Sequence, residues 1–199
     1  PIYGHYDSRH VVEGCGVAIF HVASKRVVIC YHTGEGYWFL PKGRRDAGEE
    51  SGRAAEREGY EESGFRNRLL PLAIRHRQPS PERPNPNASP SIWVTEPVWT
   101  QLAPVGRSCQ YLLRWYIAET LPPEPPPAAT SRLPSTHQEP YRPPPPYPLD
   151  LSLPARVALE PAGYVPPRHA DTGVNEEEMM YTSELVPIGE ALRLLGRRS

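Results

Sequence analysis

The sequence predicts an α/β fold, within one domain that a long proline-rich loop interrupts. Two observations lead to this prediction: extended segments rich in β-branched and aromatic residues flank a helical stretch, and an amphipathic helix closes the chain. A length of 199 residues suits one domain with a sizeable core and is too short for two large ones. We therefore expect a single domain over residues 1–199, with an insertion at about 121–170.

The first half of the chain contains a predicted hairpin followed by a short extended segment and a helix. "GCGVAIF" and "RVVICYH" are apolar runs separated by "HVASK", which is typical of two strands with a tight connection. "YWFLPKG" is a further extended segment that Pro41 and Gly43 end. A helix is expected from Ser51, a suitable N-cap, to Gly64, a suitable left-handed residue after a helix.

The second half supplies the remaining strands and the last helix. "FRNRLLPLAIRHR" is predicted to be a strand, and a polar, proline-dotted loop follows it. "WVTEPVWTQLAP" and "CQYLLRWYIAET" predict two more strands, the second with a clear alternation of apolar residues. "EEEMMYTSELV" predicts the last strand, and "PIGEALRLLGRR" predicts a helix with one apolar face.

Composition and charge exclude several classes of function. The formal net charge of −1 gives no reason to expect binding to nucleic acid or to an anionic membrane surface. No apolar run approaches the roughly 20 residues of a membrane span. Three cysteines, far apart in sequence and odd in number, suit free thiols in a reducing compartment. We expect a cytoplasmic protein, with the nucleus as the alternative location.

Three glutamates crowd the C-terminal end of the predicted helix. Glu58, Glu61 and Glu62 are three and four positions apart, so their side chains share one face and repel one another. They also face the negative end of the helix dipole. A bound Mg²⁺ or Mn²⁺ ion would resolve this conflict, because clustered carboxylates are ligands that these hard cations prefer. The alternative is a solvated acidic face beside the basic run "RNR".

The spacing around these glutamates resembles the Nudix box of the Nudix hydrolase family, G-x5-E-x7-R-E-U-x-E-E-x-G-U with U apolar. The matching residues are Gly43, Glu49, Arg57, Glu58, Glu61, Glu62, Gly64 and Phe65. "GYWFLPKG", "RAAERE" and "LVPIGEALRLL" are also similar to family segments, so the resemblance covers about residues 12–120 and 176–196. One box position departs, because Gly59 stands where an apolar side chain is expected. Glycine there indicates either unusually close helix packing or a locally weaker helix.

The resemblance implies an α/β/α sandwich of the Nudix type, with a mixed β-sheet between helices. It also implies metal-dependent hydrolysis of a diphosphate linkage by water attack on phosphorus. It implies Glu58 and Glu62 as the main ligands of Mg²⁺ or Mn²⁺, with Glu61 as a third or bridging ligand. Glu49 would complete the metal site, and Arg57 would orient a carboxylate through a bidentate salt bridge. A glutamate outside the box often serves as the general base in this family. Here "NEEEM" offers Glu176, Glu177 and Glu178, although a plain acidic turn explains that run equally well.

Two basic clusters suggest the class of substrate. Lys42, Arg44 and Arg45 flank the box glycine, and Arg75 and Arg77 follow the next predicted strand. Convergence of the clusters on a polyphosphate would favour a diphosphoinositol polyphosphate or a dinucleoside polyphosphate. Capped RNA, ADP-ribose and other nucleotides are the alternatives, and scattered surface arginines are the interpretation without function. An aromatic side chain would stack on a base, although strand tryptophans such as Trp99 are more often core residues.

The proline-rich segment offers a rival function. Residues 121–169 hold more than half of the chain's 27 prolines, which predicts a mobile, partly polyproline II loop without helix or central strand. "RPPPPYPL", around Pro144–Pro148, matches the P-P-x-Y form bound by WW domains and has Arg142 spaced as in an SH3 ligand. Short matches are frequent in proline-biased segments. The competing class is a scaffold or phosphate-sensing interaction protein, against which the intact box glutamates argue.

Overall fold

The computed structural model describes residues 4–78, 93–105, 107–123 and 140–196. Its strands are β1 (Val11–His21), β2 (Arg26–His32), β3 (Tyr37–Phe39), β4 (Lys42–Arg44), β5 (Asn67–Leu69), β6 (Trp99–Val105), β7 (Cys109–Thr120) and β8 (Tyr181–Pro187). Its helices are α1 (Ser51–Ser63), α2 (Leu153–Ala158), the 3₁₀ turn η1 (Glu178–Met180) and α3 (Ile188–Leu195). The predicted strands before and after the helix are present, and so is the closing helix.

The strands form one mixed sheet centred on β1. β1 pairs in parallel with β7 along ten residues, whereas the other pairs in the sheet are antiparallel. The predicted hairpin of β1 and β2 exists, but only Phe20 and His21 of β1 pair with β2. The middle of β1 pairs with β4 instead, Gly14 opposite Arg44 and Gly16 opposite Lys42. This exchange of partners brings the loop before α1 to the centre of the sheet.

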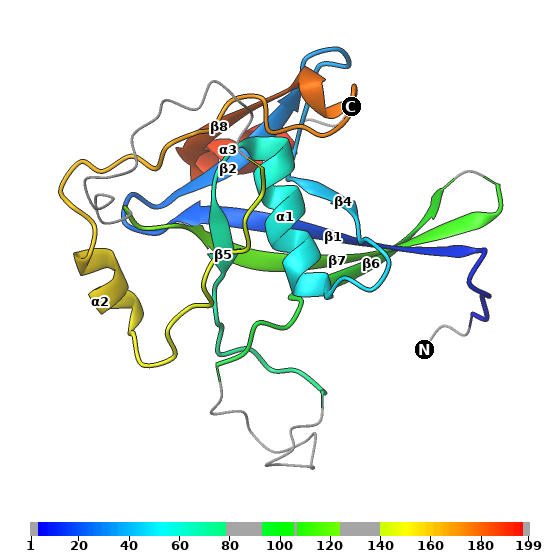
Figure 1. Ribbon diagram of the computed structural model, residues 1–199, viewed down its shortest axis with the longest axis horizontal. Helices are drawn as coiled ribbons and strands as arrows, with labels where there is room; N and C mark the ends of the chain where they lie inside the picture. The colour runs from blue at the N-terminus through cyan, green and yellow to red at the C-terminus, as the bar shows by residue number, and fades with distance from the viewer. Residues whose placement is uncertain (1–3, 79–92, 106, 124–139, 197–199) are drawn as a thin grey trace.

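Helices cover opposite faces of this sheet, which confirms the predicted sandwich (Figure 1). α1 packs through Ala54 and Ala55 on Cys15, Val17 and Val28. α3 packs through Ala191 on Val27 and Ile29, the neighbours of Val28 along β2. Successive side chains of a strand point to opposite faces, so β2 supplies core residues to both layers. None of the described helices has the length and apolar character needed to cross a membrane.

Helix α1 has the predicted length with a different first cap. Glu50, rather than Ser51, is the N-cap, because its carboxylate accepts a hydrogen bond from the Arg53 N–H at 3.0 Å. The Ser51 hydroxyl is instead 2.7 Å from the hydroxyl of Tyr116. Gly64 ends the helix with φ 75°, the left-handed conformation that was expected.

The departure at Gly59 results from close packing. A Cβ atom there would lie 2.8 Å from both Nδ2 of Asn67 and Cγ1 of Val17. The helix therefore approaches β1 and β5 to a distance that no larger residue permits. Of the two interpretations of this glycine, the structure supports unusually close helix packing.

Two further sequence-based expectations differ from the structure. The strand predicted from "FRNRLLPLAIRHR" is only Asn67–Leu69 long, since Pro71 lacks the N–H that would continue the ladder. The proline-rich segment was expected to lack helix, yet Leu153–Ala158 forms α2. Ser152 caps α2, and its proline occupies the first turn, where a missing N–H costs nothing. Residues 124–139 of the insertion lie outside the described residues.

Candidate active site

The acidic face of α1 meets strand β4 at a cleft of ≈490 Å³. The residues that line it are Lys42, Gly43, Arg44, Asp46, Arg57, Glu58, Glu61, Glu62, Tyr111, Val174, Asn175, Glu177, Glu178 and Tyr181. A Cβ atom on Gly43 would overlap the carboxylate of Glu58, so glycine at this position leaves room for that carboxylate against β4. The box glycine and the box glutamates are thus brought together by direct contact.

Arg57 joins three of the predicted catalytic carboxylates. Its Nε and Nη2 atoms lie 2.9 Å from the two oxygens of Glu49, a bidentate pair. Its Nη1 atom donates to Glu58 at 2.9 Å and to Glu61 at 2.8 Å. Nη2 also donates to the carbonyl of Arg44, at 3.0 Å. One guanidinium therefore fixes the loop before the helix and two carboxylates of the helix relative to each other.

Glu62 is held from the other side of the cleft. Its Oε2 atom accepts a hydrogen bond from the backbone N–H of Lys42 at 2.6 Å, and its side chain is buried. Burial, with further repulsion from Glu58 and Glu178, raises the pKa of Glu62 to about 8. Burial likewise raises the pKa of Glu58 to about 7, against the opposing effect of Arg57.

The pKa values of the other two box carboxylates, Glu61 and Glu49, shift in opposite directions. Burial raises the pKa of Glu61 although Arg57 acts against it. Burial also disfavours the ionised form of Glu49, but its hydrogen bonds from Arg57 and Asp46 outweigh that effect and lower the pKa of Glu49 below its ordinary value. Glu49 is not among the residues that line the cleft, and it reaches the cleft only through Arg57. The carboxylates of Glu58, Glu61 and Glu62, which do line it, are those whose negative charge lacks compensation.

This carboxylate set has the chemistry of a divalent-cation site. Mg²⁺ and Mn²⁺ prefer oxygen ligands, and an ion beside Glu58, Glu61 and Glu62 would supply the compensation that their raised pKa values show to be missing. Within the described ranges, no three acidic, histidine or cysteine side chains are grouped closely enough to enclose an ion. Arg57 and the Lys42 N–H hold these carboxylates in their present directions.

The acidic run before β8 reaches the same cleft. Glu177 and Glu178 are among its lining residues, whereas Glu176 is exposed and is not. Glu178 accepts hydrogen bonds from the Val174 N–H at 2.7 Å and from the Asn175 side chain, so it also organises its own loop. Glu177 accepts one from the Tyr181 hydroxyl at 3.2 Å. Two of the three candidates for the general base are therefore near the box carboxylates.

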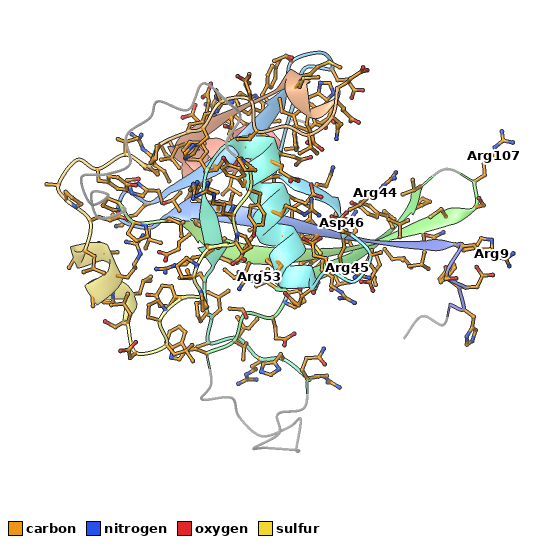
Figure 2. All side chains as sticks on the ribbon, viewed as in Figure 1. Arg9, Arg44, Arg45, Asp46, Arg53 and Arg107 are labelled. Carbon is orange, nitrogen blue, oxygen red and sulfur yellow. The ribbon has the colours of Figure 1, made fainter. Side chains whose placement is uncertain are left out.

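The predicted basic residues are divided by the fold. Lys42 and Arg44 line the cleft, while Arg45 is bonded to Glu13 at 2.9 Å and to the carbonyl of Glu49 at 2.8 Å. Figure 2 shows Arg44, Arg45 and Asp46 together beside α1, on the side of the arm formed by β6 and β7. Arg75 and Arg77 are exposed after β5 and do not line the cleft. The two basic clusters therefore do not converge.

Two aromatic residues of β7 were not expected here from the sequence: Tyr111, which lines the cleft, and Trp115, which does not but packs on the same strand, β1. A Cβ atom on Gly14 would lie 2.2 Å from the hydroxyl oxygen of Tyr111, and one on Gly16 would lie 2.5 Å from the ring of Trp115. Both rings therefore rest on the backbone of β1, on one face of the sheet. The only sequence signal is the alternation of glycines in "GCG", which has no meaning until the register of β1 with β7 is known.

Comparison with known proteins identifies one family. The NUDIX domain family matches residues 14–136. Similar solved structures include an Ap4A hydrolase binary complex from C. elegans, with 13% identity over 94% of this chain and 88% of that chain, at a TM-score of 0.41. A NUDIX family hydrolase from Clostridium perfringens shares 18% identity over 54% and 67% of the two chains, at a TM-score of 0.38. The search of curated protein sequences found no match.

Proposed function

The chain belongs to the Nudix family and is a Nudix pyrophosphohydrolase, and from this premise we propose that it cleaves a diphosphate linkage in a dinucleoside polyphosphate, using Mg²⁺ or Mn²⁺. The observation that carries the proposal is that buried box carboxylates and the cations Lys42 and Arg44 line one cleft. The carboxylates suit a metal ion, and the cations suit the phosphates of a substrate.

Each group of residues at the cleft has its own role in the proposed reaction. Glu58, Glu61 and Glu62 would hold the metal ion, with Glu49 nearby through Arg57. The ion would neutralise phosphate charge and acidify a water molecule. Arg57 keeps the carboxylates in place, and Lys42 and Arg44 would bind phosphate oxygens. Glu177 is the candidate to accept a proton, because its carboxylate has one hydrogen bond from Tyr181 whereas Glu178 is committed to its loop.

The aromatic rings favour a substrate that contains a base. Lys42 and Arg44 pair with Gly16 and Gly14, so these cations lie on the same face as Trp115 and Tyr111. Trp99 pairs with Trp115 across β6 and β7, and it is 68% exposed. A base stacked on this face would place its phosphates beside the cations. A diphosphoinositol polyphosphate has no aromatic base to stack on the tryptophans. It is therefore our second candidate, ahead of capped RNA and ADP-ribose.

The scaffold function depends on the proline-rich segment, and some residues of this segment already contact other parts of the same chain. Pro144 is buried, and its carbonyl accepts a hydrogen bond from Arg53 at 3.1 Å. The ring of Tyr147 lies beneath the guanidinium of Arg68, 5.0 Å from ring centre to Cζ. A WW or SH3 domain at Pro144–Pro148 would have to displace these contacts, so such a partner remains a weaker alternative.

The test is product release, with Mg²⁺ or Mn²⁺, from diadenosine polyphosphates, a diphosphoinositol polyphosphate, ADP-ribose and capped RNA. We expect turnover of the diadenosine compounds, and we expect none with Glu58→Gln, which serves as the blank. Trp115→Leu should raise KM for diadenosine compounds by about tenfold, the loss of one stacking contact. Turnover of the inositol compound alone would reject our choice of substrate. A folded, metal-binding protein without turnover of any compound would favour the scaffold function.

A further inference from the structure

The C-terminal end of the catalytic helix α1 has an unusually complete set of hydrogen bonds. The last carbonyls of a helix have no partner within it and need donors from elsewhere. In α1 the carbonyl of Tyr60 accepts from the Gly64 N–H at 2.7 Å, and the carbonyl of Glu62 accepts from the Cys30 thiol at 3.6 Å. The other donors come from the end of the insertion and from β8.

Residues 168–172, which we call the returning limb, are the end of the insertion as it comes back to the sheet. The Thr172 hydroxyl donates to the carbonyl of Glu61 at 2.8 Å. The His169 N–H donates to the carbonyl of Gly64, also at 2.8 Å. Arg168 donates to the Ser183 hydroxyl at 2.7 Å, and that hydroxyl in turn donates to the carbonyl of Ser63.

The limb also lies very close to the helix end. A Cβ atom on Gly64 would be 2.2 Å from the carbonyl oxygen of His169, so only glycine permits this contact. Phe65 and Arg168 form an antiparallel bridge directly after the helix. Figure 1 shows the chain passing from α2 back along the sheet to this end of α1. The limb residues lie outside the segment, residues 14–136, that matches the family, whereas the helix end that they contact lies within it.

We propose that the returning limb positions the metal-binding carboxylates, and that Thr172 is the residue through which it does so. Glu61 and Glu62 are in the last turn of α1, the part of a helix that frays first. Thr172 binds the backbone of Glu61, while Arg57 binds its side chain. Both ends of this residue are therefore fixed, as a metal ligand requires. The inference rests on the proposed metal-dependent function.

The test compares Thr172→Val, which removes the hydroxyl and keeps the shape, with Thr172→Ser, which keeps the hydroxyl. Thr100→Val makes the same chemical change at an exposed position of β6 and is the matched control. The full chain is used without substrate, and the readouts are Mn²⁺ affinity and the hydrogen exchange of residues 60–65. Mg²⁺ activation of turnover is measured separately from substrate KM.

Thr172→Val should weaken Mn²⁺ binding about fivefold and speed exchange of residues 60–65 by a similar factor, the effect of one lost hydrogen bond. It should raise the Mg²⁺ concentration needed for turnover while leaving substrate KM unchanged. Thr172→Ser and Thr100→Val should resemble the wild type. Wild-type exchange and Mn²⁺ affinity in Thr172→Val would overturn the inference, as would equal losses in Thr172→Ser. If the wild type binds no Mn²⁺, the proposed function fails instead, and exchange of residues 60–65 alone decides about the limb.

Discussion

The Nε atom of Arg156 lies 2.8 Å from Oε2 of Glu119, and both side chains are completely buried. Arg156 belongs to α2 in the insertion, and Glu119 belongs to β7 at the centre of the sheet. Glu119 also pairs with Arg68 at 2.7 Å, and Arg156 pairs with Glu160 at 2.9 Å. Glu160 in turn contacts His21 of β1 at 2.9 Å. A chain of alternating charges therefore fastens the insertion to the sheet.

Replacing Arg156 by methionine should lower the free energy of unfolding by about 3–5 kcal/mol, because it removes the shared partner of two buried carboxylates and leaves Glu119 with Arg68 alone and Glu160 with His21 alone. Urea denaturation of the full chain measures this change. Arg193→Met is the control, since Arg193 forms an exposed pair with Glu190 at 3.0 Å and should cost less than about 1 kcal/mol. Equal effects of the two substitutions would mean that the buried pairs of Arg156 stabilise the domain no more than an exposed pair does.

The sequence predicted what depends on local patterns. The spacing from Gly43 to Phe65 predicted a loop followed by helix α1, and the alternation in β7 predicted a strand. It did not predict α2, because proline content masked the cap at Ser152. Nor did it predict the pairing of Arg156 with Glu119. These residues are adjacent only because the insertion folds back on the sheet, and no periodicity records such a contact.

In the candidate site too, the sequence predicted only those neighbours that are close together along the chain. Lys42 and Arg44 line the cleft with the box glutamates, as their closeness to the box in sequence led us to expect, while their role in substrate binding stays a prediction. Arg75 and Arg77 could reach the cleft only if the chain turned towards it after β5. Because β5 ends at Leu69, the chain takes another course. The place of Tyr111 over Gly14 follows from the register of β7 with β1, which no local sequence pattern indicates.

Gly59→Ala should destabilise the protein by about 1–3 kcal/mol, although alanine favours helix more than glycine does. The added methyl group would displace Asn67, whose Nδ2 donates to the carbonyl of Glu56 at 3.0 Å. Gly189→Ala, in α3 with nothing near its Cβ position, is the control and should stabilise by up to about 1 kcal/mol. Thermal unfolding compares the two. A stabilising Gly59→Ala would refute the close packing of α1 on β1 and β5.

The metal-free protein should lose stability as pH rises from about 4.5 to about 8. The unfolded glutamates ionise near 4.5, whereas Glu58 and Glu62 keep their protons up to about 7 and about 8 when folded. In this window the folded state binds more protons, so the free energy of unfolding falls with pH. Thermal midpoints in a chelator should show this fall. Glu62→Gln should flatten it, and Glu184→Gln, at an exposed position of β8, should not.

Arg57→Lys should lower kcat about 10²-fold while the protein stays folded, because displaced catalytic groups cost about that much. A lysine ammonium cannot reproduce the planar set of donors that binds Glu49, Glu58 and Glu61 together. Arg53→Lys, at the other end of α1, makes the same change where the arginine bonds Glu56 and the carbonyl of Pro144. Steady-state kinetics with Mg²⁺ should separate the two variants. Similar kcat values would show that charge alone, and not the guanidinium shape, organises these carboxylates.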